Sequence, residues 1–243
     1  MLTSLVALAS FFGTPSETNE RSSFLFKMTE TNAPHRGERY QPQPGDILLF
    51  DDHSELTVKI YRWVGTDGPL HAAVVFRKPD GTLATLEAGT NAVMKVFNFD
   101  LEPRLQDFDG TILVRRLHKP MSGEQVRRHA EFAQAQEGKR YAIGRLALQG
   151  TPLRPRGSWL APYFGRTVVD RERWICSELV VASLVVAGVF DVDDYPANVM
   201  YPRDLCYDER FDLSPHYEAP AMWYPRPELE YVDKGVRVGR MEK

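Results

Sequence analysis

The sequence predicts an α+β fold with antiparallel strands, and three observations lead to this prediction. A short apolar run at residues 45–50 follows a Pro-Gly break and is typical of a buried strand. Two apolar runs flank Pro79-Asp80-Gly81, which is a hairpin pattern. Apolar runs that follow Ser122 and Cys176 have helical spacing and helix start signals.

Composition narrows the class of protein. The 243 residues are 43% hydrophobic and 26% charged, which is typical of a globular chain with a substantial core. The net charge of -3 provides no overall attraction to nucleic acid or to an anionic membrane. The two cysteines are too few for a disulfide framework and lack the histidine spacing of a zinc site. We therefore predict a cytoplasmic protein without a cofactor, a metal or a nucleic-acid partner.

Three regions are predicted along the chain. Residues 1–44 are expected to form a disordered or processed tail, because residues 13–44 are mostly polar. The globular domain is expected at 45–212, and a Pro-rich extension at 213–243. Within the tail, residues 1–12 are as apolar as a signal-peptide core, so export is the alternative location. This stretch is too short to span a bilayer, and no transmembrane segment is predicted.

The hairpin determines which side chains share a face. Pro79-Asp80-Gly81 fits a three-residue loop, in which the glycine supplies a left-handed conformation. With this loop, Ala73 faces Glu87. His71 and Glu87 are then diagonal neighbours on one face, about 7–8 Å apart at Cα. A two-residue loop would place the two side chains on opposite faces.

The other elements are predicted from the spacing of apolar residues and from the residues that begin or end helices and strands. In chain order they are a helix at 54–65, strands at 92–97 and 111–117, and helices at 122–138 and 176–188. Ser122 and Gln125 form a capping box, and Gly188 is a helix C-cap. A polar segment separates the two strands. Residues 150–173 are expected to form a long ordered loop. Its arginines are typical of solvated surface, but they would favour anionic substrates if the loop covers the site; they are Arg154, Arg156, Arg166, Arg171 and Arg173.

Cys176, His71 and Glu87 are the candidate catalytic residues. A cysteine on the first turn of a helix lies at the positive end of the dipole, which stabilises the thiolate. Glu87 ends an apolar strand, where an unpaired carboxylate is costly, and His71 is its nearest partner. The structural alternatives are a buried cysteine and a core histidine. Cys206 has no nearby base and is expected to be structural.

Six short motifs follow one another in a recognisable order. They are Gly-Asp-Ile-Leu-Leu at 45–49, His-Ala-Ala-Val-Val at 71–75, Leu86-Glu87-Ala88, Tyr141, Cys176-Ser177-Glu178-Leu179-Val180 and Tyr201-Pro202-Arg203-Asp204-Leu205. This order resembles the circularly permuted NlpC-type papain-like cysteine hydrolases, in the YiiX/YebB-like branch. The resemblance implies an antiparallel sheet packed on the cysteine-bearing helix.

The resemblance also assigns roles to residues. It implies that Cys176 is the nucleophile, His71 the base and Glu87 the group that orients the base. Tyr141 and Ser177 are placed in the substrate and oxyanion pocket, and no metal ligand is assigned. Ala73 departs from the family, in which glycine is common at that position.

Three functions stay open at this point. The first is a thiol hydrolase or transferase that cleaves an amide or ester bond in a small peptide, amide or lipid substrate through an acyl-enzyme on Cys176. The second is a catalytically silent module of the same fold that binds a small ligand or peptide. The third is metal binding, which requires Cys176, His71 and Glu87 to converge on one point. The sequence leaves the oligomeric state open.

Overall fold

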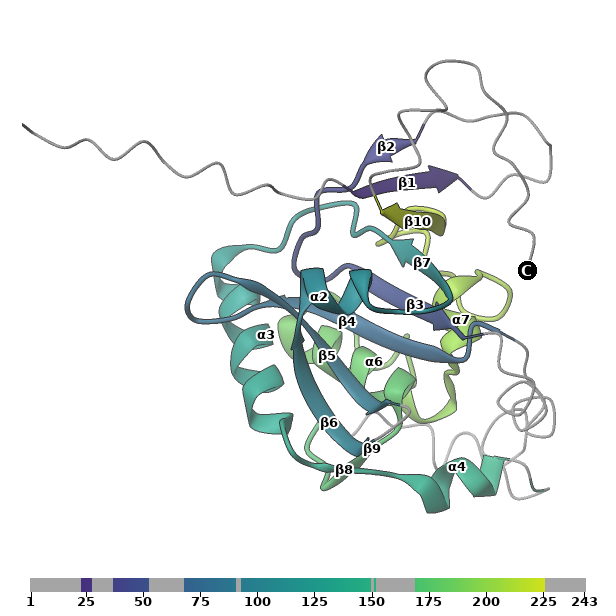
Figure 1. Ribbon diagram of the computed structural model, residues 1–243. Coiled ribbons are helices and arrows are strands. Elements are labelled where there is room, and N and C mark those ends of the chain that lie inside the picture. Colours follow the sequence, from purple (N-terminus) through teal and green to yellow (C-terminus); the bar gives the residue numbers. More distant parts are fainter. Residues whose placement is uncertain are drawn as a thin grey trace, which may run out of the picture.

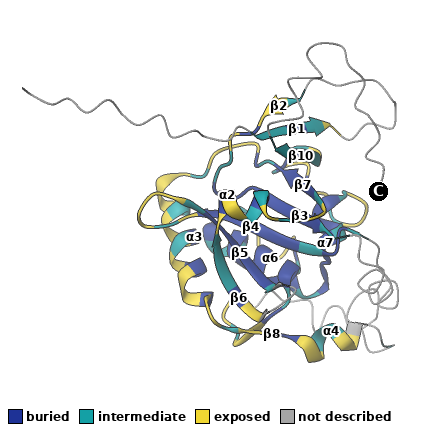
Figure 2. Ribbon diagram, in the orientation of Figure 1, coloured by how far each residue is buried: buried dark blue, intermediate teal, exposed yellow. Residues whose placement is uncertain are grey.

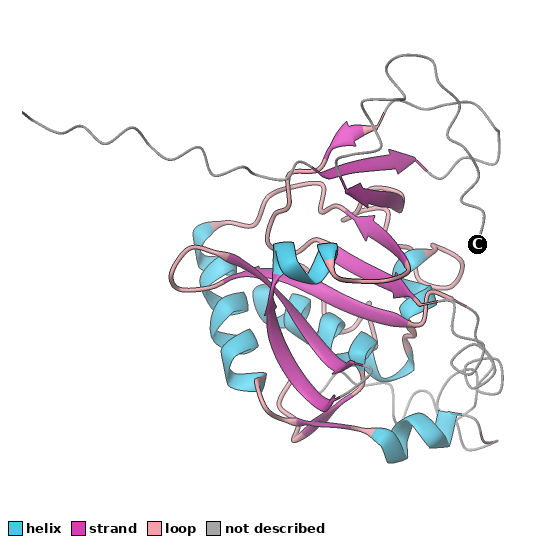
Figure 3. Cartoon of the chain, in the orientation of Figure 1, coloured by secondary structure: helices cyan, strands magenta, loops and turns pink. Residues whose placement is uncertain are grey.

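The computed structural model describes residues 23–27, 37–52, 68–90, 93–149, 151 and 169–225. In chain order the elements are β1 (Ser23–Lys27), β2 (Glu38–Arg39), β3 (Ile47–Asp51), β4 (His71–Arg77), β5 (Leu83–Thr90), β6 (Val93–Asp100), α2 (Leu101–Gln106), β7 (Thr111–Arg115), α3 (Gly123–Gln136), β8 (Arg140–Tyr141), α4 (Ile143–Gln149), β9 (Arg173–Trp174), α6 (Cys176–Ala187), η1 (Ala197–Val199), α7 (Pro202–Cys206) and β10 (Ala221–Pro225). Figure 3 shows the helices and the strands in different colours.

Within the described residues, ten strands form one sheet. Their order is β2-β1-β10-β7-β3-β4-β5-β6-β8-β9 (Figure 1). Neighbouring strands are antiparallel, except that β8 and β9 are parallel. The mixture of helices and antiparallel strands confirms the predicted α+β class.

The hairpin of β4 and β5 has the predicted register. Ala73 pairs with Glu87. At the turn, the backbone N–H of Lys78 donates to the carbonyl of Thr82 at 2.8 Å. Gly81 has a φ of 91°, the left-handed conformation that the three-residue loop requires. The loop length is therefore confirmed, and with it the shared face of His71 and Glu87.

The sheet extends into regions that the sequence analysis placed outside the domain. Strand β1 pairs with β10, and β10 pairs with β7. Residues 23–27 had been predicted to lie in the tail, and residues 221–225 in the Pro-rich extension. One side chain of each strand, Leu25 and Trp223, is buried in the sheet. Each strand is a short apolar run inside a polar stretch, so composition averaged over the stretch concealed it.

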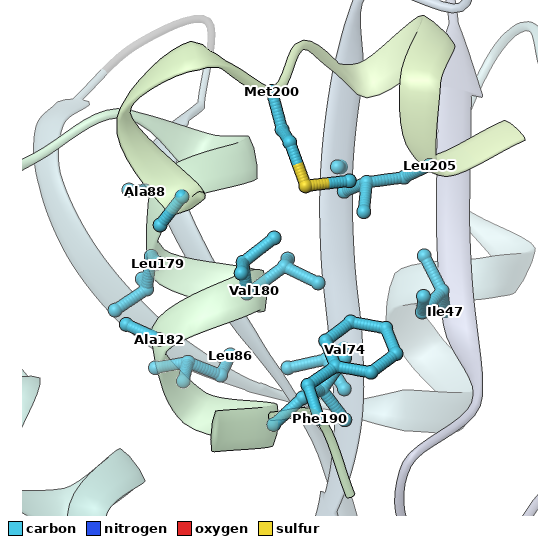
Figure 4. Close-up of a cluster of buried hydrophobic side chains, with 14 of the residues drawn as sticks. Ile47, Val74, Leu86, Ala88, Leu179, Val180, Ala182, Phe190, Met200 and Leu205 are labelled. Atoms are coloured by element: carbon cyan, nitrogen blue, oxygen red, sulfur yellow. The ribbon is translucent and has the colours of Figure 1, made fainter. Parts of the chain in front are cut away.

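Helices cover the two faces of the central strands differently. On one face α6 packs on the sheet together with α3, burying Val74, Leu86 and Val180 (Figure 4). On the other face Val75 and Leu105 belong to a separate cluster, to which the short helix α2 contributes (Figure 1). Figure 2 shows the result: the central strands and α6 are buried, whereas the outer side of α3 is exposed. The strands that carry His71 and Glu87 are therefore covered on both faces.

The helix predictions divide into three groups. The capping box of Ser122 and Gln125 is confirmed at the start of α3, and Gly188 ends α6 with a φ of 74°. The polar segment after β6 contains a helix, α2, that the sequence analysis missed because six residues with Pro103 in the first turn show no periodicity. The predicted helix at 54–65 lies outside the described residues, as do positions 152–168 of the long loop.

A buried histidine on α3 makes stability depend on pH. His129 is fully buried, and neither ring nitrogen has a hydrogen-bond partner among the described residues. Burial lowers its pKa to about 4, below the ordinary value of 6.5. The unfolded chain therefore binds the proton more readily than the folded protein does. The contribution of neutral His129 to the free energy of unfolding is fully present above pH 6.5 and is lost as the pH falls through 4.

We expect His129→Leu to stabilise the protein, and to do so more at acidic pH. At pH 5 the variant should gain about 2 kcal/mol more in unfolding free energy than it gains at pH 8, because the protonated unfolded state no longer competes. Urea unfolding at the two pH values measures this difference. Equal gains at both values would show that His129 does not titrate on unfolding.

Candidate active site

Three elements bring the predicted catalytic residues together. His71 is the first residue of β4, Glu87 lies near the end of the neighbouring strand β5, and Cys176 is the first residue of α6. The imidazole Nε2 of His71 lies 3.0 Å from Oε2 of Glu87. The thiol of Cys176 interacts with the same imidazole, and each group shifts the pKa of the other. Since Nε2 is engaged by the carboxylate, Nδ1 is the nitrogen left for the thiol.

His71 joins the two faces of the sheet. Its carboxylate partner Glu87 is paired with Ala73, whose side chain belongs to the cluster on the α2 face. Cys176 begins α6, which packs on the opposite face. Because His71 is the first residue of its strand, its ring can contact a carboxylate on one face and a thiol at the tip of a helix on the other. Strand parity alone predicts the first contact but not the second.

Burial and hydrogen bonding act in opposite directions on the three pKa values. Burial lowers the pKa of His71, but hydrogen bonds to Cys176 and Glu87 raise it to about 9. Burial raises the pKa of Cys176, but the imidazole brings the pKa below its ordinary value. Burial also raises the pKa of Glu87, while His71 and Arg104 lower it to about 2. At neutral pH the balances at His71 and Glu87 favour an imidazolium and a carboxylate, and the imidazole moves the pKa of the thiol in the direction that favours the thiolate.

Exposure differs along this chain of groups. Cys176 is 1% exposed and the carboxylate side chain of Glu87 is 0% exposed, whereas 18% of the His71 side chain is exposed. The imidazole is therefore the part of the arrangement that reaches the surface. A substrate that approaches the thiol would pass beside this ring.

Backbone groups also contact the sulfur. The N–H groups of Ala72 and Ser177 hydrogen-bond to Cys176 and lower its pKa further. The hydroxyl of Ser177, by contrast, is buried and donates to the carbonyl of Met200 at 2.7 Å. Ser177 thus contacts the sulfur through its backbone, and its side chain ties α6 to the segment that follows η1.

Tyr141 lies against the end of the hairpin strand that carries Glu87. It belongs to the hydrophobic core cluster. Its ring packs on Gly89, where a Cβ atom would come within 2.5 Å of Tyr141 Cδ2. Strand β8 also pairs Tyr141 with Trp174, two residues before Cys176. Tyr141 therefore links the strand end of β5 to the chain entering α6.

Two partners of Glu87 were missed by the sequence analysis. Arg104, on α2, donates from Nε to Oε1 at 2.8 Å and from Nη2 to Oε2 at 3.0 Å. The hydroxyl of Thr85 donates to Oε1 at 2.7 Å. Strand alternation could have predicted Thr85, because it lies two residues from Glu87 on the same face. Arg104 left no such signal, since its helix was not predicted.

A second carboxylate lies close to the nucleophile along the chain. Oε1 of Glu178 is 2.7 Å from Nη1 of Arg145 and 3.2 Å from Nε of Arg171, and Oε2 accepts from the backbone N–H of Ile175 at 3.3 Å. Two arginines that share one carboxylate leave positive charge beside the start of α6. Of the arginines predicted in the long loop, Arg154, Arg156 and Arg166 lie outside the described residues.

Cys206 has the environment of a structural cysteine. It is fully buried, and burial raises its pKa to about 12. A thiol with this pKa is protonated at neutral pH and is a poor nucleophile. Because Cys206 and Cys176 lie in the same chain, Cys206 is an internal control for the reactivity of Cys176.

The geometry does not favour metal binding. Among the described residues, no group of three or more His, Cys, Asp or Glu side chains is arranged to hold a metal ion. His71 lies between the thiol and the carboxylate, and Glu87 is already bound by Arg104, so the three groups form a line and do not converge. This geometry therefore does not support the third alternative, in which Cys176, His71 and Glu87 would converge on a metal ion.

One cavity lies away from the candidate catalytic residues. It has a volume of about 1020 Å³ and is lined by Tyr40, Lys78, Glu102 and Trp223 among others, but not by Cys176, His71 or Glu87. Leu101 and Leu105 of α2 also line it. Helix α2 thus has this cavity on one side and the Glu87 carboxylate on another.

The residues define a thiol–imidazole–carboxylate site on an α+β fold, and comparisons with known proteins add a distant structural likeness. No family model matches the sequence, and a search of curated proteins finds no match. Among solved structures, the chain is similar to the crystal structure of the metalloprotein yiiX from Escherichia coli O157:H7, DUF1105. The two chains are 22% identical, with a TM-score of 0.43 over 61% of this chain and 67% of that chain. We assign no residue a role from this likeness.

No helix in the described part of the chain is both long enough and apolar enough to cross a membrane.

Proposed function

We propose that the protein is a cysteine hydrolase or acyltransferase with a circularly permuted papain-like core, acting through an acyl-enzyme on Cys176. The observation that supports the proposal is that the His71 imidazole bonds to the Glu87 carboxylate and also interacts with the Cys176 thiol. Cysteine hydrolases use such an arrangement because the thiolate is the nucleophile, the imidazole handles its proton and a third group orients the imidazole.

The proposed reaction follows from the roles of the three groups. The Cys176 sulfur attacks the carbonyl carbon of an amide or ester, and the electron pair of the C=O bond moves to oxygen. His71 gives its proton to the leaving amine or alcohol as the C–N or C–O bond breaks. Water, or an acceptor molecule, then attacks the thioester carbonyl while His71 takes up its proton, and the C–S bond breaks to release the acyl product and restore the Cys176 thiolate. The backbone N–H of Cys176, at the start of α6, is the proposed donor to the oxyanion.

Peptide amides and lipid esters are both candidate substrates. Arg145 and Arg171, which share Glu178 beside the start of α6, support a substrate with an anionic group. A panel of fluorogenic peptide amides and acyl esters, each with and without a carboxylate, separates these classes. An acyl adduct on Cys176, detected by intact mass, identifies the class that reacts.

The proposal is tested by the rate at which iodoacetamide labels Cys176. At pH 6 we expect Cys176 to react about tenfold faster than a free thiol, because it is ionised where a free thiol is not. His71→Ala should remove this advantage. Between pH 6 and pH 9 the rate should rise less steeply than that of a free thiol, because the imidazole lowers the pKa of Cys176. Mass spectrometry of the two cysteine-containing peptides measures both rates in one sample.

Cys206 provides the control in the same sample. Its buried, protonated thiol should remain unlabelled at pH 6 in both proteins. If Cys176 reacts no faster than a free thiol, or if His71→Ala leaves its rate unchanged, the enzymatic proposal fails. A reactive Cys176 that accepts no acyl group from the panel would instead favour the silent binding module.

A further inference from the structure

Arg104 grips both oxygens of the Glu87 carboxylate. Its Nε and Nη2 atoms donate at 2.8 Å and 3.0 Å, to Oε1 and Oε2 respectively. His71 shares Oε2 and Thr85 shares Oε1, so the carboxylate accepts four hydrogen bonds. A two-pronged contact of this kind fixes the plane of a carboxylate, which a single hydrogen bond does not. The orientation of Glu87 toward His71 is therefore set largely by Arg104.

The surroundings of Arg104 suit a guanidinium. Its Cζ atom lies 4.3 Å from the ring centre of Phe50 and 5.3 Å from that of Phe108. The side chain is 17% exposed. A planar, delocalised cation can lie on aromatic rings and still donate two parallel hydrogen bonds, whereas a lysine ammonium cannot do both. The pocket thus selects for arginine by shape as well as by charge.

In the proposed reaction, the Arg104 guanidinium balances the charge of Glu87 when His71 is neutral. In that reaction His71 alternates between a charged and a neutral ring. Without Arg104, Glu87 would be a fully buried carboxylate with no cationic partner whenever the ring is neutral, which is strongly unfavourable. Arg104 is a permanent cation, so it balances the carboxylate in both states of the ring.

We infer that Arg104 is a positioning residue that keeps Glu87 ionised and correctly oriented while His71 gains and loses its proton. This inference rests on the proposed function. Cys176, His71, Glu87 and Arg104 then act as one relay that runs from α6 across the sheet to α2.

Few other charges influence this relay among the described residues. The charged or titratable groups that contact Glu87 are His71 from β4 and Arg104 from α2, and Cys176 contacts the other side of the imidazole. The strand partners of Glu87 are Ala73 on β4 and Phe97 on β6, which carry no charge. A change at Arg104 should therefore reach His71 through Glu87.

The test is an NMR titration of the His71 ring in the full-length protein, with its signal assigned from its absence in His71→Gln. In Arg104→Met we expect the His71 pKa to rise by about one unit or more, because the carboxylate is no longer shared with a cation. Arg104→Lys retains the charge and should restore the pKa to within about half a unit of wild type. In a Glu87→Gln background, Arg104→Met should shift the His71 pKa by at most a few tenths of a unit, because the carboxylate through which Arg104 acts on His71 is absent.

The outcomes separate this inference from the proposed function. An unchanged His71 pKa in a folded Arg104→Met protein would overturn the inference and leave Arg104 a purely structural role. A shift that persists with Glu87→Gln would also overturn it, because Arg104 would then act on His71 directly. Arg104→Gln is judged by the same criterion if Arg104→Met does not fold, as checked by circular dichroism. The iodoacetamide rate of wild-type Cys176 tests the proposed function independently of all these titrations.

Discussion

Replacing Glu87 by alanine is expected to lower the free energy of unfolding by about 3–5 kcal/mol. The fully buried carboxylate is the shared partner of His71 and Arg104. Its removal leaves two largely buried cationic groups side by side without a counter-charge. Urea unfolding at pH 7, followed by circular dichroism, measures the loss.

The contribution of Glu87 to the free energy of unfolding depends on pH. The pKa of Glu87 is about 2 in the folded protein, below its ordinary value of 4.5. Its contribution to stability is therefore present above pH 4.5 and is lost as the pH falls through 2. Glu87→Ala should remove that acid-dependent part of the stability.

An exposed glutamate provides the matched control for this prediction. Glu102 lies on α2, close in sequence to Arg104, and its side chain is exposed. Glu102→Ala should change the free energy of unfolding by no more than about 0.5 kcal/mol. If Glu87→Ala costs as little as Glu102→Ala, the carboxylate is not the counter-charge that holds the two cations.

Replacing Gly89 by alanine is the second large effect, and we expect it to cost about 3–5 kcal/mol. Gly89 has a φ of 74°, and a Cβ atom there would meet the Tyr141 ring at 2.5 Å. The substitution therefore combines left-handed strain with a steric clash in the core. Because Tyr141 is tied to the strand that precedes Cys176, the rate of Cys176 labelling should also fall.

Gly138 allows the two causes to be separated. Its φ of 79° is close to that of Gly89, but a Cβ atom there would have no neighbour within 4 Å. Gly138→Ala should therefore cost only the conformational part, about 1–2 kcal/mol. Thermal unfolding of both variants measures the difference. Equal losses at the two positions would mean that Tyr141 moves aside without cost.

Local signals explain why much of the site was predictable. The turn Pro79-Asp80-Gly81 fixed the register of its hairpin, and that register brought His71 to Glu87. The apolar run that ends at Gly188 identified the helix that begins with Cys176. Each of these signals depends on residues that are close in sequence, for which turn and helix chemistry are decisive.

The features that could not be predicted from the sequence depend on contacts between segments that are distant along the chain. The contact of Cys176 with His71 depends on how α6 crosses the end of β4, which no local pattern encodes. Arg104 was missed because its short helix is stabilised by burying Leu101 and Leu105 on the sheet, not by periodicity. Strands β1 and β10 were missed because each gains its stability from the other.

That pairing of β1 with β10 has a practical consequence for anyone who shortens the gene. Trimming the protein to residues 45–212 would retain Cys176, His71, Glu87 and Arg104, but it would remove the strand that covers Leu113 and Val114 of β7. The uncovered backbone would offer a row of free N–H and C=O groups to other molecules. A minimal soluble version should therefore begin before residue 23 and end after residue 225.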